Sequence, residues 1–253
     1  MKRDDYINKL KKIDFFKDGM HPEYMPFVGE DYAKYKILHV GESHYIAEDA
    51  KLTLDDYKGW WEGKQSENLS KLADGWYNTD NIVNWYMQGE RHKGHGIFTN
   101  VLKSFCKVVV PNEYFTAITT EDSKKYNYFA FMNFYQMPSI YNGVNFTKAL
   151  CAAGEKENLS AEQIDNIWSE CMEKSAKIFE DVVNALDPVS IVVSSREVEK
   201  YYCKVGKLFN DPRMIYVDHP DSAWWNKKKE GAEETSKEHL ESRLKEIYYK
   251  TNK

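Results

Sequence analysis

The segment at residues 36–45 constrains the fold of this chain more than any other stretch. Ile37, Leu38 and Val40 are apolar and partly β-branched, as is typical of a buried strand. Gly41 then permits a tight turn and the close approach of a ligand to the backbone. Open α/β sheets bind ligands just beyond the carboxyl ends of their strands. We therefore predict a binding crevice at this strand end, with these candidate residues: Gly41, Glu42, Ser43, His44 and Tyr45.

Strands alternate with helical segments along the rest of the chain. Apolar runs at 128–138, 191–193 and 214–217 predict three further strands. Residues 160–186 keep helical spacing after a capping-box pattern at Ser160, which predicts a long helix between two of these strands. Such alternation is typical of a parallel sheet with right-handed crossovers. We therefore predict an α/β fold, a three-layer α/β/α sandwich with a central, mainly four-stranded parallel sheet.

The chain has 253 residues, a length most simply explained by one domain, 1–253, with insertions. Residues 47–91 lack β alternation and are rich in aromatic side chains, which predicts a helical insertion after the first strand. An insertion at the carboxyl edge of a sheet often acts as a lid. Apolar residues among charges predict a short helix within residues 2–18 and a C-terminal helix at about 236–253.

Composition narrows the classes of partner. The chain carries 35 Lys and Arg against 40 Asp and Glu, so its net charge of −5 offers no argument for nucleic-acid binding, although a local basic surface stays compatible with it. No apolar run approaches the ~20 residues of a membrane span, and the N-terminal residues lack the apolar core of a signal peptide. We expect a cytoplasmic protein without a membrane partner.

The cysteines do not indicate a metal site. They are widely spaced and form no Cys-x-x-Cys pair, which is unlike a zinc ribbon or a local iron–sulfur ligand set. In a reducing compartment such cysteines are free thiols of the core. We therefore predict no metal and no cofactor, and free thiols at four positions: Cys106, Cys151, Cys171 and Cys203.

Further polar and aromatic residues follow the later strands. The apolar half of the strand at 128–138 ends at Asn133, whose amide offers the donors and the acceptor needed to read a nucleobase edge. His219 follows the last predicted strand. Trp224 and Trp225 come next, and two large rings exposed side by side require a functional reason. These residues extend the predicted crevice to the ends of at least three strands.

Five short motifs occur in order along the chain: Gly-Glu-Ser-His-Tyr at 41–45, Gly-His-Gly-Ile-Phe at 94–98, Phe-Met-Asn at 131–133, Pro-Val-Ser-Ile-Val-Val at 188–193 and Asp-His-Pro-Asp-Ser at 218–222. Their order resembles that of the uracil-DNA glycosylase superfamily, over residues 36–226. That family has a strand ending in a Gly-Gln/Glu motif, a glycine-containing helix entry with an aromatic residue, a strand ending near Asn, a strand–helix pair and a final His-Pro-Ser. Here the last motif reads His-Pro-Asp, and Ser43 stands where the best-known members have an acidic residue.

The resemblance implies a role for each matching residue. Glu42 would belong to the water-positioning motif, Phe98 would stack on the base and Asn133 would read its edge. His219 would stabilise the negative charge that develops on the departing base. This assignment suits the chemistry, because cleavage of an N-glycosidic bond forms an oxocarbenium-like sugar and an anionic base.

The resemblance also implies a substrate class. It predicts a uracil-DNA glycosylase-like fold that hydrolyses the N-glycosidic bond of uracil, or of a modified or deaminated base, in DNA. The expected partner is nucleic acid or another nucleobase-containing ligand. A base in a duplex must be flipped out, and Trp224 or Trp225 could fill the vacated position in the stack.

Two other functions fit parts of the sequence. In an SGNH-type ester hydrolase, Ser43 would be the nucleophile, His219 its base and Asn133 an oxyanion donor. That family places an aspartate three residues before the histidine, and this chain has Tyr216 there. A non-catalytic binding module of the glycosylase-like fold is the third interpretation. The acidic charge and the altered first motif favour this module, whereas the presence of Glu42, Asn133 and His219 favours catalysis.

Overall fold

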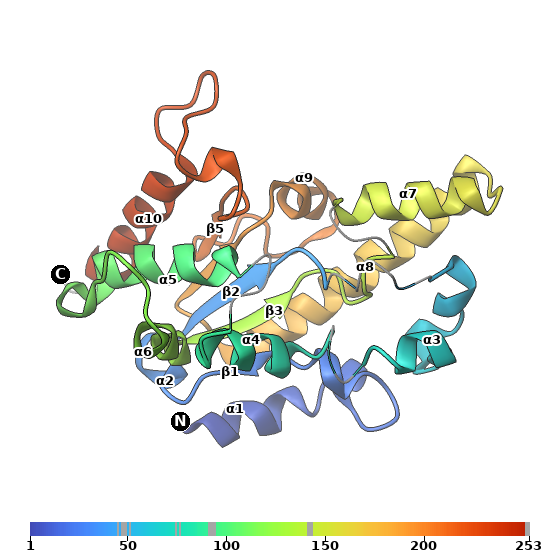
Figure 1. Ribbon diagram of the computed structural model, residues 1–253, viewed down its shortest axis with the longest axis horizontal. Helices are drawn as coiled ribbons and strands as arrows, with labels where there is room; N and C mark the ends of the chain where they lie inside the picture. The colour runs from blue at the N-terminus through green and yellow to red at the C-terminus, as the bar shows by residue number, and fades with distance from the viewer. Residues whose placement is uncertain are drawn as a thin grey trace.

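The computed structural model describes residues 1–44, 46, 50, 52–73, 75, 77–90, 95–140 and 144–250. Of Lys250 it describes the backbone alone. A five-stranded sheet with the order β1-β3-β2-β4-β5 lies at the centre of the chain (Figure 1). β2 pairs in parallel with β3 and β4, and β4 pairs in parallel with β5. The strands are β1 (Phe27–Val28), β2 (Ile37–Gly41), β3 (Phe129–Asn133), β4 (Ser190–Val193) and β5 (Met214–Tyr216).

The predicted α/β architecture is confirmed, and all four predicted strands form the parallel part of the sheet. β3 is shorter than the predicted strand at 128–138, because the chain bends directly after Asn133. β1 pairs antiparallel with β3 at the edge of the sheet and was not predicted. Two residues are too few for a strand period to appear in the sequence.

Helices pack on both faces of the sheet, because alternate strand residues point to opposite faces. Leu38 and Val40 join a core that α1, α8 and α9 cover. Ile37 and Val192 join a second core on the other face, which α4, α5 and α10 cover (Figure 1). The sheet therefore lies between two helical layers. These helices are α1 (Arg3–Leu10), α4 (Thr79–Met87), α5 (Gly96–Val109), α8 (Ala161–Leu186), α9 (Arg196–Val205) and α10 (Ser236–Lys250).

Helix α8 begins and ends where its local sequence predicts. The backbone N–H of Gln163 donates to Ser160 Oγ at 3.2 Å, and the N–H of Ser160 donates to Gln163 Oε1 at 2.8 Å. Asp187 ends the helix with a left-handed φ of 47°, and Pro188 follows. Reciprocal capping at one end and a proline stop at the other explain why this prediction is confirmed.

The described part of the insertion at 47–91 contains four short helices joined by turns and irregular segments, which agrees with the predicted helical character. Trp60 packs in the first core. The C-terminal helix starts at Ser236 as predicted, and residues 251–253 lie outside the described ranges. Within those ranges, no helix combines the length and apolar character needed to cross a membrane. The shorter elements are η1 (Asp14–Phe16), η2 (Pro22–Tyr24), α2 (Tyr32–Tyr35), η3 (Leu54–Tyr57), η4 (Trp60–Glu62), α3 (Glu67–Ser70), η5 (Pro111–Glu113), α6 (Thr120–Ser123), η6 (Lys124–Tyr128), α7 (Phe146–Lys156) and η7 (Ala223–Trp225).

Candidate functional site

The parallel register brings several predicted residues to one edge of the sheet. Gly41 at the end of β2 lies opposite Asn133 at the end of β3. On the other side of β2, the N–H of Ser194 donates to the carbonyl of Val40 at 2.8 Å. Asn133, Gly41 and Ser194 therefore stand side by side across three strands, at the carboxyl edge where α/β sheets bind ligands.

Gly41 makes room for the side chain of Asn133. A Cβ atom at position 41 would lie 2.3 Å from Asn133 Oδ1 and 3.2 Å from the ring of Phe131. Asn133 is 8% exposed, and its amide forms no hydrogen bond with any residue in the described ranges. The amide therefore retains its donors and its acceptor for a ligand.

Glu42 is held between the first turns of two helices. Its Oε1 accepts a hydrogen bond from the N–H of Phe146 at 3.0 Å, and its Oε2 accepts one from Ser195 Oγ at 2.8 Å. Phe146 is the first residue of α7, and Ser195 is the N-cap of α9. Burial raises the pKa of Glu42 above its ordinary value, although both hydrogen bonds oppose this rise. The carboxylate is thus fixed in place, with one lone pair left on each oxygen.

Ser43 and His44 face the interior beneath the insertion. They are 5% and 2% exposed, and neither Ser43 Oγ nor His44 Nδ1 has a hydrogen-bond partner among the described residues. His44 Nε2 lies 3.3 Å from Oγ1 of Thr79, the first residue of α4. Burial lowers the pKa of His44 to about 3, so its imidazole is neutral. Tyr45, the last residue of the predicted set, lies outside the described residues.

His219 lies beyond the end of β5, in a loop that docks on the start of α5. Its Nδ1 accepts a hydrogen bond from the N–H of Asp221 at 3.2 Å, and burial lowers its pKa. Asn100 Nδ2 donates to the carbonyl of Pro220 at 2.8 Å. A Cβ atom on Gly96, the first residue of α5, would lie 2.3 Å from Asp221 Oδ1. Two motifs more than 100 residues apart therefore meet here.

Phe98 lies in this region but inside a cluster of rings. It is 2% exposed, and its centroid lies 4.9 Å from that of Phe131 and 5.1 Å from that of Tyr126. A base could stack on Phe98 only if neighbouring rings moved. Gly94, at the start of the same motif, lies outside the described residues.

The two adjacent tryptophans have different environments. Trp225 is 2% exposed and belongs to the second core, so the two rings are not exposed side by side as expected, and Trp225 could fill a base stack only by leaving this core. Trp224 is 49% exposed, because the turn of η7 directs it away from that core. Trp224 is therefore the one candidate of this pair for a contact with a partner.

The predicted ester-hydrolase pair is not formed. Ser43 Oγ has no partner within the described part of the chain, and His219 Nδ1 accepts from a backbone N–H. The Ser43–His219 hydrogen bond that would activate a nucleophile is thus absent from the described residues.

Three polar residues near this edge were not predicted from the sequence: His39, Ser194 and Ser195. His39 is fully buried in β2, with Nδ1 at 2.6 Å from Tyr126 Oη and Nε2 at 2.8 Å from Ser194 Oγ. Burial, and to a smaller extent the nearby His219, lowers the pKa of His39 to about 3. Ser195 binds Glu42, as described above. The signals were a histidine inside an apolar strand and a Ser-Ser pair directly after another strand.

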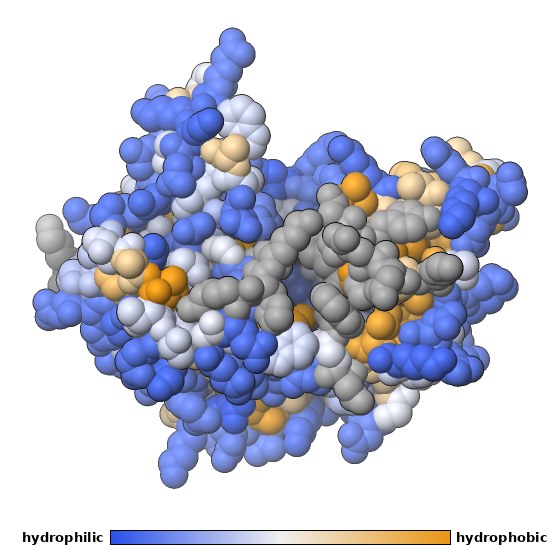
Figure 2. Space-filling model, viewed as in Figure 1, coloured by the Kyte–Doolittle hydropathy of each residue, from blue (hydrophilic) through white to orange (hydrophobic). Residues whose placement is uncertain are grey.

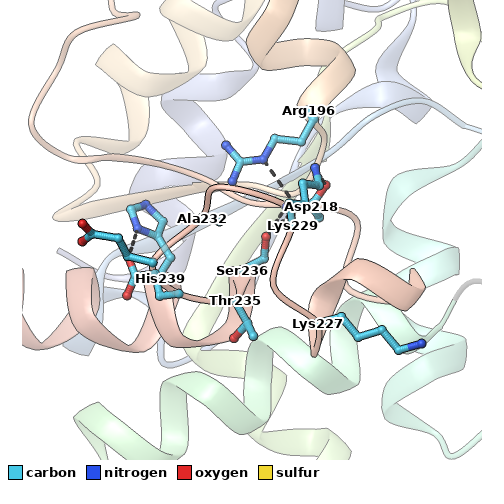
Figure 3. Close-up of a pocket in the computed structure, with 10 residues that line it drawn as sticks. Arg196, Asp218, Lys227, Lys229, Ala232, Thr235, Ser236 and His239 are labelled. Atoms are coloured by element: carbon cyan, nitrogen blue, oxygen red, sulfur yellow. Dashed lines mark hydrogen bonds and ion pairs between the residues drawn. The ribbon is translucent and has the colours of Figure 1, made fainter.

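A cavity of about 230 Å³ adjoins the site on the β5 side (Figure 3). Asp218 lines this cavity and accepts hydrogen bonds from Lys229 Nζ at 2.5 Å and Ser236 Oγ at 2.7 Å. Arg196 Nε lies 3.8 Å from the same carboxylate, whereas Lys227 points away from the cavity (Figure 3). These contacts tie the loop at 226–235 to the body. Figure 2 shows that this projecting loop, like most of the face in view, is hydrophilic.

A second cavity, of about 240 Å³, is polar and lies beside the start of α4. The residues that line it are Pro22, Glu23, Met25, Asn78, Asp80, Asn81 and Asn84.

No group of three or more metal-binding side chains occurs in the part of the chain that the structure describes. Comparisons with protein-family models, curated proteins and solved structures find no match to this chain.

Proposed function

We propose that this chain hydrolyses the N-glycosidic bond of uracil, or of a modified or deaminated base, in DNA. The proposal includes a uracil-DNA glycosylase-like fold, with the base bound at the carboxyl edge of the sheet. The observation that supports it most is the Asn133 amide, which lies over Gly41 without a hydrogen bond to any described residue. An amide with free donors and a free acceptor can read the edge of a base.

His219 is suited to stabilise the departing base. Its Nδ1 accepts a hydrogen bond from a backbone N–H, so a neutral ring carries its proton on Nε2. Burial lowers the pKa of His219, which keeps the ring neutral at pH 7. A neutral imidazole can thus donate its Nε2 proton to the oxygen on which negative charge develops.

Glu42 is suited to the opposite side of the reaction. Its ionised form is supported by two donors at helix N-termini, and each oxygen can accept one more hydrogen bond. A water bound there would be positioned for attack, and the negative charge would stabilise an oxocarbenium-like sugar. Each Glu42 oxygen already accepts a hydrogen bond from the protein, which also suits a structural role for this carboxylate. The alternative function is therefore a non-catalytic module that binds a base without releasing it.

The proposal is tested with oligonucleotides that carry uracil, hypoxanthine, xanthine or modified pyrimidines. Base release leaves alkali-labile sites, which gel electrophoresis detects. We expect release of at least one base by the wild type, and losses of at least 100-fold in Glu42→Gln and His219→Gln. His239→Gln, on a histidine paired with Glu234 near the surface, is the matched control and should keep full activity.

Two results would contradict the proposal. Glycosylase function is rejected if the wild type releases none of these bases, and binding without release then supports the non-catalytic module. The assigned roles are rejected if the wild type is active and the Glu42 and His219 variants match the His239 control.

A further inference from the structure

Three buried polar side chains under the site have no role in the proposed chemistry. Tyr126, His39 and Ser194 are each 0% exposed and form a chain of two hydrogen bonds. The distances are 2.6 Å from Tyr126 Oη to His39 Nδ1 and 2.8 Å from His39 Nε2 to Ser194 Oγ. Among the described residues, the side chain of Ser194 forms no other hydrogen bond.

The protonation state of His39 limits how the protons of these two hydrogen bonds can be arranged. His39 is neutral because burial lowers its pKa to about 3. A neutral imidazole has one N–H donor and one acceptor nitrogen. In one arrangement the Tyr126 hydroxyl donates to Nδ1, and Nε2–H donates to Ser194. In the other, Ser194 donates to Nε2, and Nδ1–H donates to Tyr126.

The two arrangements differ in which buried hydroxyl proton lacks an acceptor, that of Tyr126 or that of Ser194. Its ring stacks on Phe129 with centroids 4.7 Å apart and lies 5.1 Å from Phe98 and 5.7 Å from Tyr86. In the second arrangement the phenolic proton would be buried among these rings without an acceptor in the described part of the chain, which is costly. The first arrangement satisfies that proton and instead leaves the equally buried hydroxyl proton of Ser194 without an acceptor among the described residues. Of the two hydroxyls, that of Ser194 is the one beside Gly41, where a ligand could accept the proton.

Ser194 is positioned to use this proton at the site. It follows β4 next to Gly41, on the side opposite Asn133. Its side chain lies on the same face of the sheet as His39 and Phe131, where a Cβ atom at position 41 would also project. A ligand over Gly41 would have the Asn133 amide on one side and the Ser194 hydroxyl on the other.

We infer that Ser194 donates a hydrogen bond to an acceptor atom of the bound base, and that Tyr126 and His39 are positioning residues that fix Ser194 as the donor. This inference rests on the proposed function and narrows its substrate class. A fixed donor pairs with a ring carbonyl oxygen, as in uracil, and disfavours an exocyclic amino group at the same position, as in cytosine, because two donors would then face each other.

The proton arrangement is measured directly by NMR of the full chain with ¹⁵N-labelled histidine. We expect His39 to carry its proton on Nε2 and to remain neutral from about pH 8 to about pH 5. Assignment comes from the signals lost in His39→Gln. A proton on Nδ1, or a charged ring in this range, overturns the positioning role whatever the activity of the protein.

The role of Ser194 is measured with a matched pair of variants. Ser194→Ala and Ser190→Ala each remove one buried hydroxyl from the same strand region, but Ser190 bonds to Tyr248 at the opposite end of β4. The readouts are binding of free uracil and free cytosine, and release of each base from oligonucleotides. We expect Ser194→Ala to reduce the preference for uracil about tenfold and Ser190→Ala to leave it unchanged.

Each part can fail separately. An unchanged preference in Ser194→Ala, or an equal change in both variants, overturns the donor role of Ser194. A wild type that neither binds nor releases any base overturns the proposed function and the donor role together, and the NMR result still decides the position of the proton on His39.

Discussion

Replacement of Gly41 by alanine tests the geometry at the centre of the proposed site. The added Cβ would lie 2.3 Å from Asn133 Oδ1, far inside van der Waals contact, and 3.2 Å from Phe131 Cζ. The φ of Gly41 is not positive, so alanine fits the backbone itself. The clash is therefore relieved only if the Asn133 side chain rotates away.

The cost of this movement can be bounded. Forcing a side chain from its preferred rotamer costs about 0.5–1.5 kcal/mol, and overpacking a buried site typically costs about 1–3 kcal/mol. Because the obstructing atom belongs to a side chain rather than to the backbone, we expect Gly41→Ala to lower the free energy of unfolding by about 1–2 kcal/mol. We also expect loss of base binding by more than tenfold, since the Asn133 amide would be displaced.

Two other glycines without positive φ give a graded series. At Gly75 the one contact that a Cβ would make with the described residues is Trp85, at 3.9 Å, so Gly75→Ala should change stability by less than about 0.5 kcal/mol or increase it slightly. At Gly29 a Cβ would lie 2.1 Å from the backbone oxygen of Asn127. A backbone atom cannot rotate away, so Gly29→Ala should cost about 3 kcal/mol or more.

Urea unfolding of the three variants, with and without Asn133→Ala, measures the effect. In the Asn133→Ala background the obstructing oxygen is gone and the 3.2 Å approach to Phe131 remains, so the cost of Gly41→Ala should fall to less than about half. Equal costs of Gly41→Ala in both backgrounds, or a stability order other than Gly75, Gly41, Gly29, would refute the contact between Gly41 and Asn133.

Three further predictions follow from burial. Trp225→Ala should lower the free energy of unfolding by about 3–5 kcal/mol and Trp224→Ala by less than about 1 kcal/mol, as measured by chemical denaturation, because the first ring is 2% and the second 49% exposed. His44 has its pKa lowered from 6.5 to about 3, so below pH 6.5 the unfolded chain binds a proton that the folded chain does not, and stability should fall with decreasing pH. We expect His44→Gln to reduce the slope near pH 5 by about 1.4 kcal/mol per pH unit relative to the wild type, and an unchanged slope would show that His44 is accessible to protons. Glu42 has its pKa raised from 4.5, so its ionisation costs stability as the pH rises from 4.5 through the folded value, and urea unfolding of Glu42→Gln at several pH values should not show this loss.

Local sequence accounts for much of the fold. The capping box at Ser160 and the stop at Pro188 define α8, and apolar runs define the four parallel strands. These signals could be read because each depends on residues a few positions apart. The edge strand β1 could not, since its two residues are ordered by pairing with β3, about 100 residues later.

The site shows the limit of this reasoning. The residue order along the chain indicated that Gly41, Asn133 and His219 follow strands, and the parallel register places the first two side by side. The direction of each side chain could not be predicted from the sequence. Trp224 and Trp225 are identical neighbours, yet the ring of Trp225 enters the core and that of Trp224 does not.

The sequence by itself therefore determined the four parallel strands, the long helix α8 and the edge of the sheet where polar residues collect. The tertiary structure alone decided what each polar side chain faces. Glu42 is held by Phe146 and Ser195, more than 100 residues away, and His39 is held by Tyr126 and Ser194. The reason is physical, because periodicity records whether a residue is buried, whereas hydrogen-bond partners depend on which distant segments pack against it.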